Sequence, residues 1–325
     1  MISKKTIGFL LKIGIVIFSL FFLLNELTDR TTINQLNSHD LIGQIHERWV
    51  FMIAVLVMMF LNWSIEALKW RFLISKIEDI SFLKSIRAVF SGITVSTFTP
   101  NRIGEYGGRV FCLETGDRIQ AVLITIIGSM AQLLTTIFFG FSALLFLPKY
   151  LPEFYQLISS VNLTFSVLVF LVLLINFLSV FLFLNTSFVS KILSKIRFLG
   201  RYKKYNAVFS FYTKKELIRV LFFSIARYMV FTTQFFILLI VFDVEINYLD
   251  AINLTMIMLL VISVIPTIAI TEISVRGSVA VFLFGLVSFN TIGVLSAALA
   301  LWIINLLLPA LIGTFFVFSL KFFRS

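Results

Sequence analysis

The sequence contains little charge, and few cysteines, histidines and prolines. Charged residues make up 13% of its 325 residues, and there are five prolines, two histidines and one cysteine. Soluble globular domains carry about a quarter charged residues, so this chain has too few to form a water-exposed surface. The single cysteine, Cys112, excludes an internal disulfide and a cysteine metal cluster. His39 and His46 show no zinc-site spacing. We therefore expect no metal site and no cofactor.

Apolar residues are abundant instead. They make up 59% of the chain, and the mean hydropathy is +1.03. Three uncharged runs are 119–147, 157–184 and 291–320. Each is long enough to cross a hydrocarbon core of about 30 Å at about 1.5 Å per residue. The runs lack the alternation of a membrane β-barrel. The sequence predicts an all-α integral membrane protein, with 1–325 as a single transmembrane domain.

Six long spans are expected along the chain. The first is interpreted as a retained span because no small-residue cleavage site follows it. Thr213 and Glu216 have capping-box spacing and are expected to open the fifth. The predicted spans are 6–27, 50–68, 119–147, 161–184, 217–242 and 291–320.

The positions of lysine and arginine predict the orientation. Segments on one side of the predicted spans hold 19 of these residues, and segments on the other side hold three: Arg30, Arg48 and Lys149. The positive-inside rule places the richer set in the cytoplasm, together with both termini. We expect a multi-pass protein of the cytoplasmic (inner) membrane. The basic stretch 191–219 is a membrane anchor or an anionic-lipid contact. No nucleic-acid partner is expected, because the basic charge follows the topology.

Two apolar stretches, 82–116 and 251–287, do not fit single spans. Charged residues interrupt each one near its middle. The first starts and ends at basic, cytoplasmic segments, and the second starts and ends at external ones. Each is therefore expected to return to its own side as a re-entrant helical hairpin. Two such broken segments at corresponding places are typical of an inverted-repeat transporter. No residue-level repeat relates the two halves.

The hairpin tips contain turn and capping residues. Thr99 is expected to cap a helix that starts at Pro100, and Thr271 to cap the return helix of the second hairpin. Pro266 breaks the second stretch. Gly104 and Gly108 offer close approach between helices.

The same tips contain charged residues, which are costly at mid-membrane unless they are paired, solvated or bound to a ligand. Arg102, Glu105 and Arg109 are spaced i, i+3, i+7 and are expected to share one helix face. Glu272 and Arg276 form an i,i+4 pair. Two interpretations stay open: a buried ion network that joins the hairpins, or a site for a polar anion.

The excess of three arginines over two glutamates favours the anion site, since a guanidinium matches the geometry of phosphate. The predicted substrate-binding residues are Arg102, Glu105, Arg109, Glu272 and Arg276, joined by Arg227 from the fifth span. Glu66, three residues before Lys69, is interpreted as structural.

The first tip resembles a signature of the flippase-like transmembrane region of the lysylphosphatidylglycerol synthases, which also occurs in stand-alone proteins. That signature is similar to Asn/Thr-x-x-Pro-x-Arg-x-Gly-Glu-x-x-Arg. The matching residues here are Thr97, Pro100, Arg102, Gly104, Glu105 and, after one extra residue, Arg109. The second tip is similar at Pro266 and Ile273–Arg276, but lacks the family's glycines and has Gly277 in place of a glutamate. Gly128–Gln132 lacks the family's acidic–basic pair.

The resemblance implies translocation of a lipid and no enzymatic activity, since this sequence shows no aminoacyl-transferase domain. There is no Walker motif. The expected partners are membrane lipids, either an anionic phospholipid or a polyprenyl phosphate. A second copy of the chain and an envelope-biosynthesis protein stay open as partners. Two other functions also stay open: a polyprenyl-phosphate-dependent membrane transferase, using Asp29 and Asp40, and an accessory subunit of an envelope-lipid pathway.

Overall fold

The computed structural model describes residues 41–99, 102–153, 165–185, 207–266 and 269–317, with Phe21 and Asn25 alone outside these ranges. Every element in these ranges is a helix, which confirms the all-α prediction. Five of the helices are long and apolar enough to cross a membrane. They are α4 (Trp49–Ile74), α7 (Arg118–Leu144), α10 (Phe165–Leu184), α13 (Lys214–Val241) and the continuous run Thr291–Val317.

These five helices agree with five of the six predicted spans. The remaining one, 6–27, lies outside the described residues except for Phe21 and Asn25. The predicted capping box opens α13: the Thr213 side chain accepts the N–H of Glu216, whose carboxylate accepts the N–H of Thr213. The last run consists of α16 (Thr291–Trp302), a π-helical turn η4 (Ile303–Leu307) and α17 (Leu308–Val317). Three short elements, α3 (Leu41–Glu47), α8 (Leu147–Tyr150) and η3 (Ala207–Ser210), flank the spans.

The stretch 82–116 forms a first helix pair, α5 (Phe82–Thr97) and α6 (Gly104–Val110), whose helices pack on each other. The chain returns after α6 to the loop that precedes α5. There the Glu78 carboxylate accepts hydrogen bonds from the backbone N–H groups of Glu114, Thr115 and Gly116. Both ends of the first helix pair are therefore held together.

The stretch 251–287 forms a second helix pair, α14 (Tyr248–Val264) and α15 (Ala269–Phe284). Its ends also meet. The side-chain amide of Asn290, just after α15, donates to the carbonyls of Phe242 and Asp243, just before α14, at 3.1 and 3.0 Å. The chain thus follows the order span, helix pair, span twice: α4, first pair, α7, and then α13, second pair, α16–α17.

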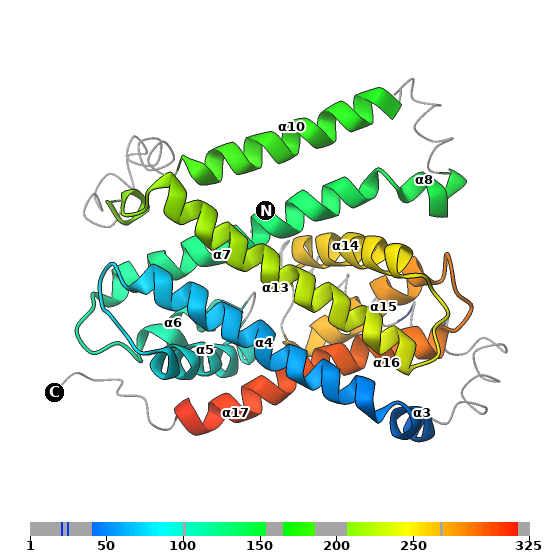
Figure 1. The fold of residues 1–325 in the computed structure, drawn as a ribbon, viewed down its shortest axis with the longest axis horizontal. Coiled ribbons are helices and arrows are strands. Elements are labelled where there is room, and N and C mark those ends of the chain that lie inside the picture. The colour runs from blue at the N-terminus through cyan, green and yellow to red at the C-terminus, as the bar shows by residue number, and fades with distance from the viewer. Residues whose placement is uncertain are drawn as a thin grey trace, which may run out of the picture.

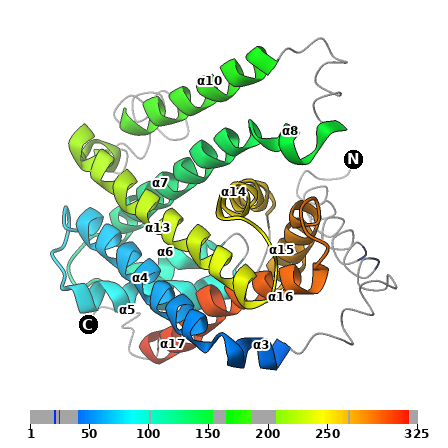
Figure 2. The ribbon, with the colours of Figure 1, turned by 45° about the vertical axis from the view of Figure 1, so that its right-hand side comes forward.

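Each helix pair packs against the last span of the other half (Figures 1 and 2). Helix α5 lies on α17, where a Cβ built on Gly313 would be 2.2 Å from the Phe90 carbonyl oxygen. Helix α14 lies on α7, where a Cβ built on Gly140 would be 2.6 Å from the Leu260 Cβ. A glycine permits the close approach in both places. The two halves are therefore joined in two ways: each helix pair packs on the last span of the other half, and α4 packs on α13.

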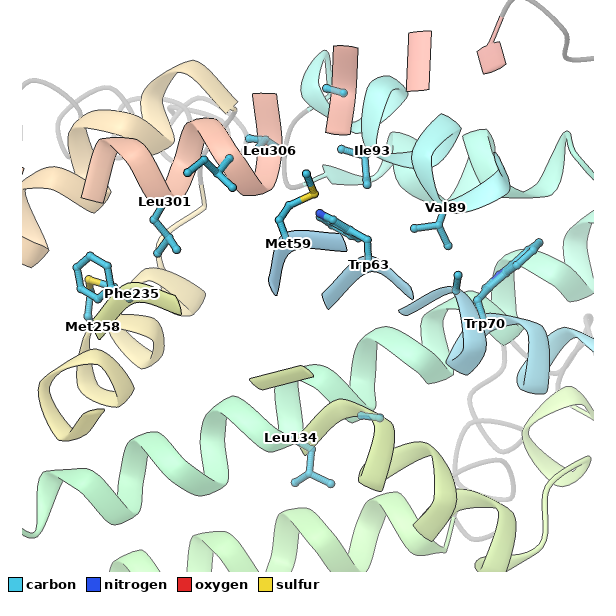
Figure 3. Close-up of a cluster of buried hydrophobic side chains, with 14 of the residues drawn as sticks. Met59, Trp63, Trp70, Val89, Ile93, Leu134, Phe235, Met258, Leu301 and Leu306 are labelled. Atoms are coloured by element: carbon cyan, nitrogen blue, oxygen red, sulfur yellow. The ribbon is translucent and has the colours of Figure 1, made fainter. Parts of the chain in front are cut away.

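The apolar core lies where these elements cross, while α10 lies at one edge against α7 and α13 (Figure 1). Figure 3 shows Met59 and Trp63 of α4 facing Ile93 of α5 and Leu306 of η4. Met59 and Ile93 are each 2% exposed. The core therefore draws on both halves, and this packing holds the tips of the two helix pairs in place.

Candidate functional site

The first tip differs from the predicted geometry. Helix α6 begins at Gly104 rather than at Pro100, which lies outside the described residues. Thr99 is not its N-cap, although its hydroxyl oxygen accepts the N–H of Gly104 at 2.8 Å. The physical reason for the later start is the backbone of Arg102, whose φ of 56° is left-handed and incompatible with the first turn of an α-helix.

This late start also separates Arg102 from the helix face predicted for it. Arg102 precedes α6, whereas Glu105 and Arg109 form an ion pair within α6.

Gly104 and Gly108 lie where α6 approaches α5 closely. A Cβ built on Gly104 would be 2.6 Å from the Val95 carbonyl oxygen, and one on Gly108 would be 2.7 Å from the Gly92 Cα.

The second tip lies between α14 and α15. Pro266 follows the end of α14, and residues 267–268 are outside the described chain. Helix α15 begins at Ala269, so Thr271 lies inside its first turn and is not the predicted cap. The Thr271 carbonyl accepts the hydroxyl of Ser274 at 3.1 Å, a local side-chain bond within the helix. Glu272 and Arg276 form the expected i,i+4 pair, at 2.7 Å.

The two tips meet through Glu272. Its carboxylate accepts two hydrogen bonds from Arg102 Nη2, at 3.0 and 2.8 Å, and one from Arg276 Nη2 at 2.7 Å. Glu272 and Arg276 are 5% and 8% exposed, whereas the Arg102 side chain is 42% exposed. One carboxylate therefore holds two guanidinium groups, and Arg102 is the more accessible of the two.

A second charged cluster is centred on Glu66 of α4. Its carboxylate pairs with Lys69 at 2.8 Å, with Arg109 of α6 at 2.9 Å and with Arg227 of α13 at 2.8 Å. Glu66, Lys69 and Arg109 are 4%, 1% and 2% exposed. Glu105 joins the cluster through Arg109. Glu66 thus links α4, α6 and α13. The sequence predicted only its contact with Lys69 within α4.

Arg227 continues this cluster into a chain of buried amides. Its Nε donates to Asn62 Oδ1 at 2.9 Å, and its guanidinium lies 4.7 Å from the centre of the Trp63 ring. Asn62 donates to Asn305 in the π-helical turn η4, and Asn305 donates to Gln234. π-Helical turns in membrane helices often occur at functional positions. Arg227 therefore points into the protein and does not reach toward a membrane surface.

Three adjoining cavities surround these charges. The largest, about 590 Å³, is lined by Arg102, Glu272 and Arg276 on one side and by the end of α14, from Leu259 to Pro266, on the other. A second, about 320 Å³, is lined by Glu66, Lys69, Glu105 and Arg227. A small one of about 80 Å³ lies between Arg227 and Arg276. Arg102 lines all three, and we call these three adjoining spaces together the chamber.

The chamber carries excess positive charge. Five cations (Lys69, Arg102, Arg109, Arg227 and Arg276) face three carboxylates (Glu66, Glu105 and Glu272), so five minus three leaves two positive charges. Arg276 also has unused donors, since its Nε and Nη1 are buried without a hydrogen-bond partner. Buried N–H donors without partners are costly, and an anion is a ligand that could satisfy them beside this excess of positive charge. The described residues show no group of three or more His, Cys, Asp or Glu that could hold a metal ion.

The structure brings together all six predicted binding residues, but in two groups. Arg102, Glu272 and Arg276 surround the largest cavity, and Glu105, Arg109 and Arg227 surround Glu66. Sequence reasoning underestimated Glu66 and missed Asn62, Gln234 and Asn305. The sequence did contain one signal for Glu66. A Glu–Lys pair inside an apolar span is costly without further partners, so Glu66 and Lys69 indicated additional polar residues nearby.

The comparison with protein families gives one match. A family model described as the lysylphosphatidylglycerol synthase TM region matches residues 9–313, which is most of the chain. No curated protein matches, and no solved structure matches.

Proposed function

The chain belongs to the family of the lysylphosphatidylglycerol synthase TM region, and from this membership and the cationic chamber we propose that it moves an anionic, phosphate-bearing lipid between membrane leaflets. The substrate class is an anionic phospholipid or a polyprenyl phosphate. Family membership supports a role with membrane lipids, and the chamber supports the sign of the headgroup charge.

One observation carries this proposal: the cavity of about 590 Å³ is lined by both charged and apolar residues. Arg276 lines it and has two buried donors, Nε and Nη1, without partners, and Arg102 is accessible beside it. The same cavity is lined by Ile262, Val264 and Ile265, and Val264 is 75% exposed. A guanidinium pair binds phosphate oxygens, while apolar side chains tolerate the glycerol and acyl portion of a lipid.

The two helix pairs are, in this proposal, the re-entrant hairpins of an inverted-repeat transporter. Helices α5 and α15 each have 16 residues, or about 24 Å at 1.5 Å per residue, which exceeds half of a hydrocarbon core of about 30 Å. In both halves the helix pair packs on the last span of the other half, α5 on α17 and α14 on α7, and this equivalence supports an inverted repeat. The headgroup binds where the two tips meet, and each half rocks against the other.

The orientation and the absence of catalysis also belong to the proposal. The positive-inside rule supports the cytoplasmic membrane and cytoplasmic termini. We infer no enzymatic step because each carboxylate at the chamber is held by a cation, as in the pairs Glu66–Arg109, Glu105–Arg109 and Glu272–Arg276. A carboxylate held in this way is a poor general base.

Reconstitution of the purified protein into vesicles tests the proposal. The probe is phosphatidylglycerol with a fluorescent acyl chain, and dithionite quenching reports the fraction in the outer leaflet. The expected result is rapid exchange by the native chain and exchange at least about tenfold slower by Arg276→Gln. A charge-assisted hydrogen bond contributes about 1.5–3 kcal/mol, and 1.4 kcal/mol corresponds to about tenfold.

Arg48→Gln is the matched control. Arg48 also pairs with a carboxylate, that of Asp243, but it lies outside the three cavities. It should leave exchange unchanged. If the native chain moves no more lipid than empty vesicles, or if Arg276→Gln exchanges at the native rate, lipid translocation through this site is wrong. A scaffold protein would give the first result.

A further inference from the structure

The cavity of about 320 Å³ has neutral polar residues on one side in addition to its charged ones. Three of them, Ser129, Gln132 and Thr136, are spaced i, i+3, i+7 on α7 and so share one helix face. Tyr228 of α13 and Ser263 of α14 line the same cavity. We call these five residues the polar wall. Thr136 and Ser263 also line the cavity of about 590 Å³, so the polar wall reaches from one cavity to the other.

Three residues that line the cavity of about 320 Å³ have a buried polar atom without a hydrogen-bond partner. The atoms are Trp63 Nε1, Gln132 Oε1 and the Tyr228 hydroxyl oxygen. Trp63 and Tyr228 are 5% and 2% exposed. Buried polar atoms of proteins are nearly always paired with another protein group, with water or with a ligand. These three atoms therefore indicate which hydrogen bonds a bound molecule must offer.

The required molecule must both donate and accept. An indole N–H only donates, an amide oxygen only accepts, and a phenol does both. The hydroxyls of Ser129, Thr136 and Ser263 donate to backbone carbonyls of their own helices, at 3.2, 3.2 and 2.7 Å, so their oxygens remain as acceptors. A ligand hydroxyl donates and accepts and so satisfies this mixture, whereas an ammonium only donates.

The charges of the same cavity also disfavour an ammonium. Its charged lining residues are Lys69, Arg102 and Arg227 against Glu66 and Glu105, so three minus two leaves one positive charge. A cationic headgroup would be repelled by this excess, and a neutral one would not. The volume of about 320 Å³ lies within the range of small-molecule pockets, about 300–1,000 Å³. The cavity therefore suits a neutral group that carries hydroxyls.

We propose that the polar wall binds the hydroxyls of a neutral polyol headgroup, while Arg102 and Arg276 hold the phosphate to which that headgroup is attached. Arg102 lines both cavities, so a phosphate beside it has the polar wall within reach. This inference rests on the proposed lipid translocation and narrows its substrate to phosphodiester lipids with a hydroxylated headgroup. Gln132 and Tyr228 are the specificity-determining residues.

Competition binding tests the proposal without any transport step. Fluorescent phosphatidylglycerol bound to native protein in mixed micelles is displaced by unlabelled phosphatidylglycerol or phosphatidylpropanol. Phosphatidylpropanol keeps the phosphodiester, its negative charge and a propyl chain, but has no headgroup hydroxyl. It should bind at least about fourfold more weakly, since each of two neutral hydrogen bonds contributes about two- to tenfold.

Two results would overturn the proposal. Equal displacement by both lipids would mean that water alone occupies the polar wall. Stronger displacement by phosphatidylethanolamine than by phosphatidylglycerol would mean that the cavity selects an ammonium. Both measurements use the native chain, so neither depends on whether a variant folds.

Tyr228→Phe tests the assigned residue. Its ring should stay stacked on Phe139, where the centroids are 5.2 Å apart, and the hydroxyl that it loses has no protein partner. The preference for phosphatidylglycerol over phosphatidylpropanol should fall about two- to tenfold. Tyr248→Phe is the matched control, because Tyr248 is 48% exposed and lies outside the three cavities. It should keep the native preference, and a Tyr228→Phe protein that also keeps it would overturn the proposal.

Vesicle exchange separates this proposal from the proposed function. Native protein that exchanges fluorescent phosphatidylglycerol and phosphatidylpropanol equally fast, and binds them equally, overturns the polyol specificity alone. Exchange of neither lipid overturns the proposed translocation. Faster exchange of phosphatidylglycerol, together with its tighter binding in micelles, supports both.

Discussion

Arg102 and Glu272 lie 170 residues apart in the chain, and Arg102 Nη2 lies 2.8 Å from Glu272 Oε2. This contact joins the tip of the first helix pair to the first turn of α15, and Glu272 also holds Arg276. A headgroup phosphate that enters the cavity therefore competes with Glu272 for both guanidinium groups. The pair holds the site together without lipid and must loosen when lipid binds.

Removal of the Glu66 charge should destabilise the protein. Glu66→Gln leaves Lys69, Arg109 and Arg227 without their shared carboxylate. Loss of one partner from a buried ion pair costs about 3–5 kcal/mol. The free energy of unfolding in mixed micelles measures this loss. Glu114→Gln is the control, since Glu114 is 79% exposed beside Lys84 and should cost less than about 1 kcal/mol. Equal effects would show that the Glu66 cluster adds nothing to stability.

A methyl group at Gly313 should separate the two halves. Its Cβ would lie 2.2 Å from the Phe90 carbonyl oxygen, so α17 must move away from α5. Overpacking of this kind costs about 1–3 kcal/mol. The thermal midpoint in detergent should fall for Gly313→Ala. It should hold or rise for Gly107→Ala, whose Cβ would lie 3.9 Å from the nearest side-chain atom, in Phe111. A native midpoint for Gly313→Ala would contradict the close packing of α5 on α17.

Glu78 should make stability depend on pH. Burial disfavours its charge, but the N–H groups of Gly116 and Thr115 and the Lys84 ammonium outweigh that effect and lower the pKa of Glu78 to about 2. A lowered folded-state pKa gives stability that is present above the unfolded pKa, about 4.5, and is lost as the pH falls toward 2.

Glu78→Gln should therefore lower the thermal midpoint at neutral pH, and the difference from the native chain should shrink between about pH 4.5 and 2. Asp79→Asn is the control, because Asp79 is the exposed neighbour in the chain. A difference between Glu78→Gln and the native protein that stays constant over this range would contradict the role of the carboxylate in holding the ends of the first helix pair.

The sequence predicts the spans well and the tips poorly, for physical reasons. Hydropathy and charge placement decide where a helix crosses a membrane, so the ends of α7 and α13 fall within about three residues of the predicted ones. Helix α4 starts one residue before its predicted span but continues six residues beyond the predicted end at 68. The start of α6 follows the left-handed backbone of Arg102, and the Arg102 side chain pairs with Glu272 on the distant α15. No local pattern encodes that contact. The central position of Glu66 likewise arises from packing of α4, α6 and α13, which are distant in sequence.

Cysteine labelling tests the proposed orientation. In a Cys112→Ser background, Phe289→Cys should react with a membrane-impermeant maleimide added outside intact cells, and Ser75→Cys should react only after lysis. Phe289 is 94% exposed between α15 and α16, and Ser75 is exposed at the end of α4. Ser75 is expected on the cytoplasmic face because α4 ends in a basic segment, and Phe289 is expected on the external face because it follows the second helix pair. Labelling of both from outside would overturn the orientation and the opposed entry of the two helix pairs.

Mass spectrometry of lipid bound to the gently purified protein tests the shared anion site most directly. The native chain should retain an anionic, phosphate-bearing lipid. Arg276→Gln should lose it while the purified protein stays folded and monodisperse, since Arg276 has two donors that no protein group accepts. Its thermal midpoint should fall, because the buried Glu272 carboxylate then keeps Arg102 alone. Arg48→Gln should retain it. If Arg276→Gln retains as much of the same lipid as the native chain, or if the retained lipid is uncharged in both, the site between the two tips is not a headgroup site.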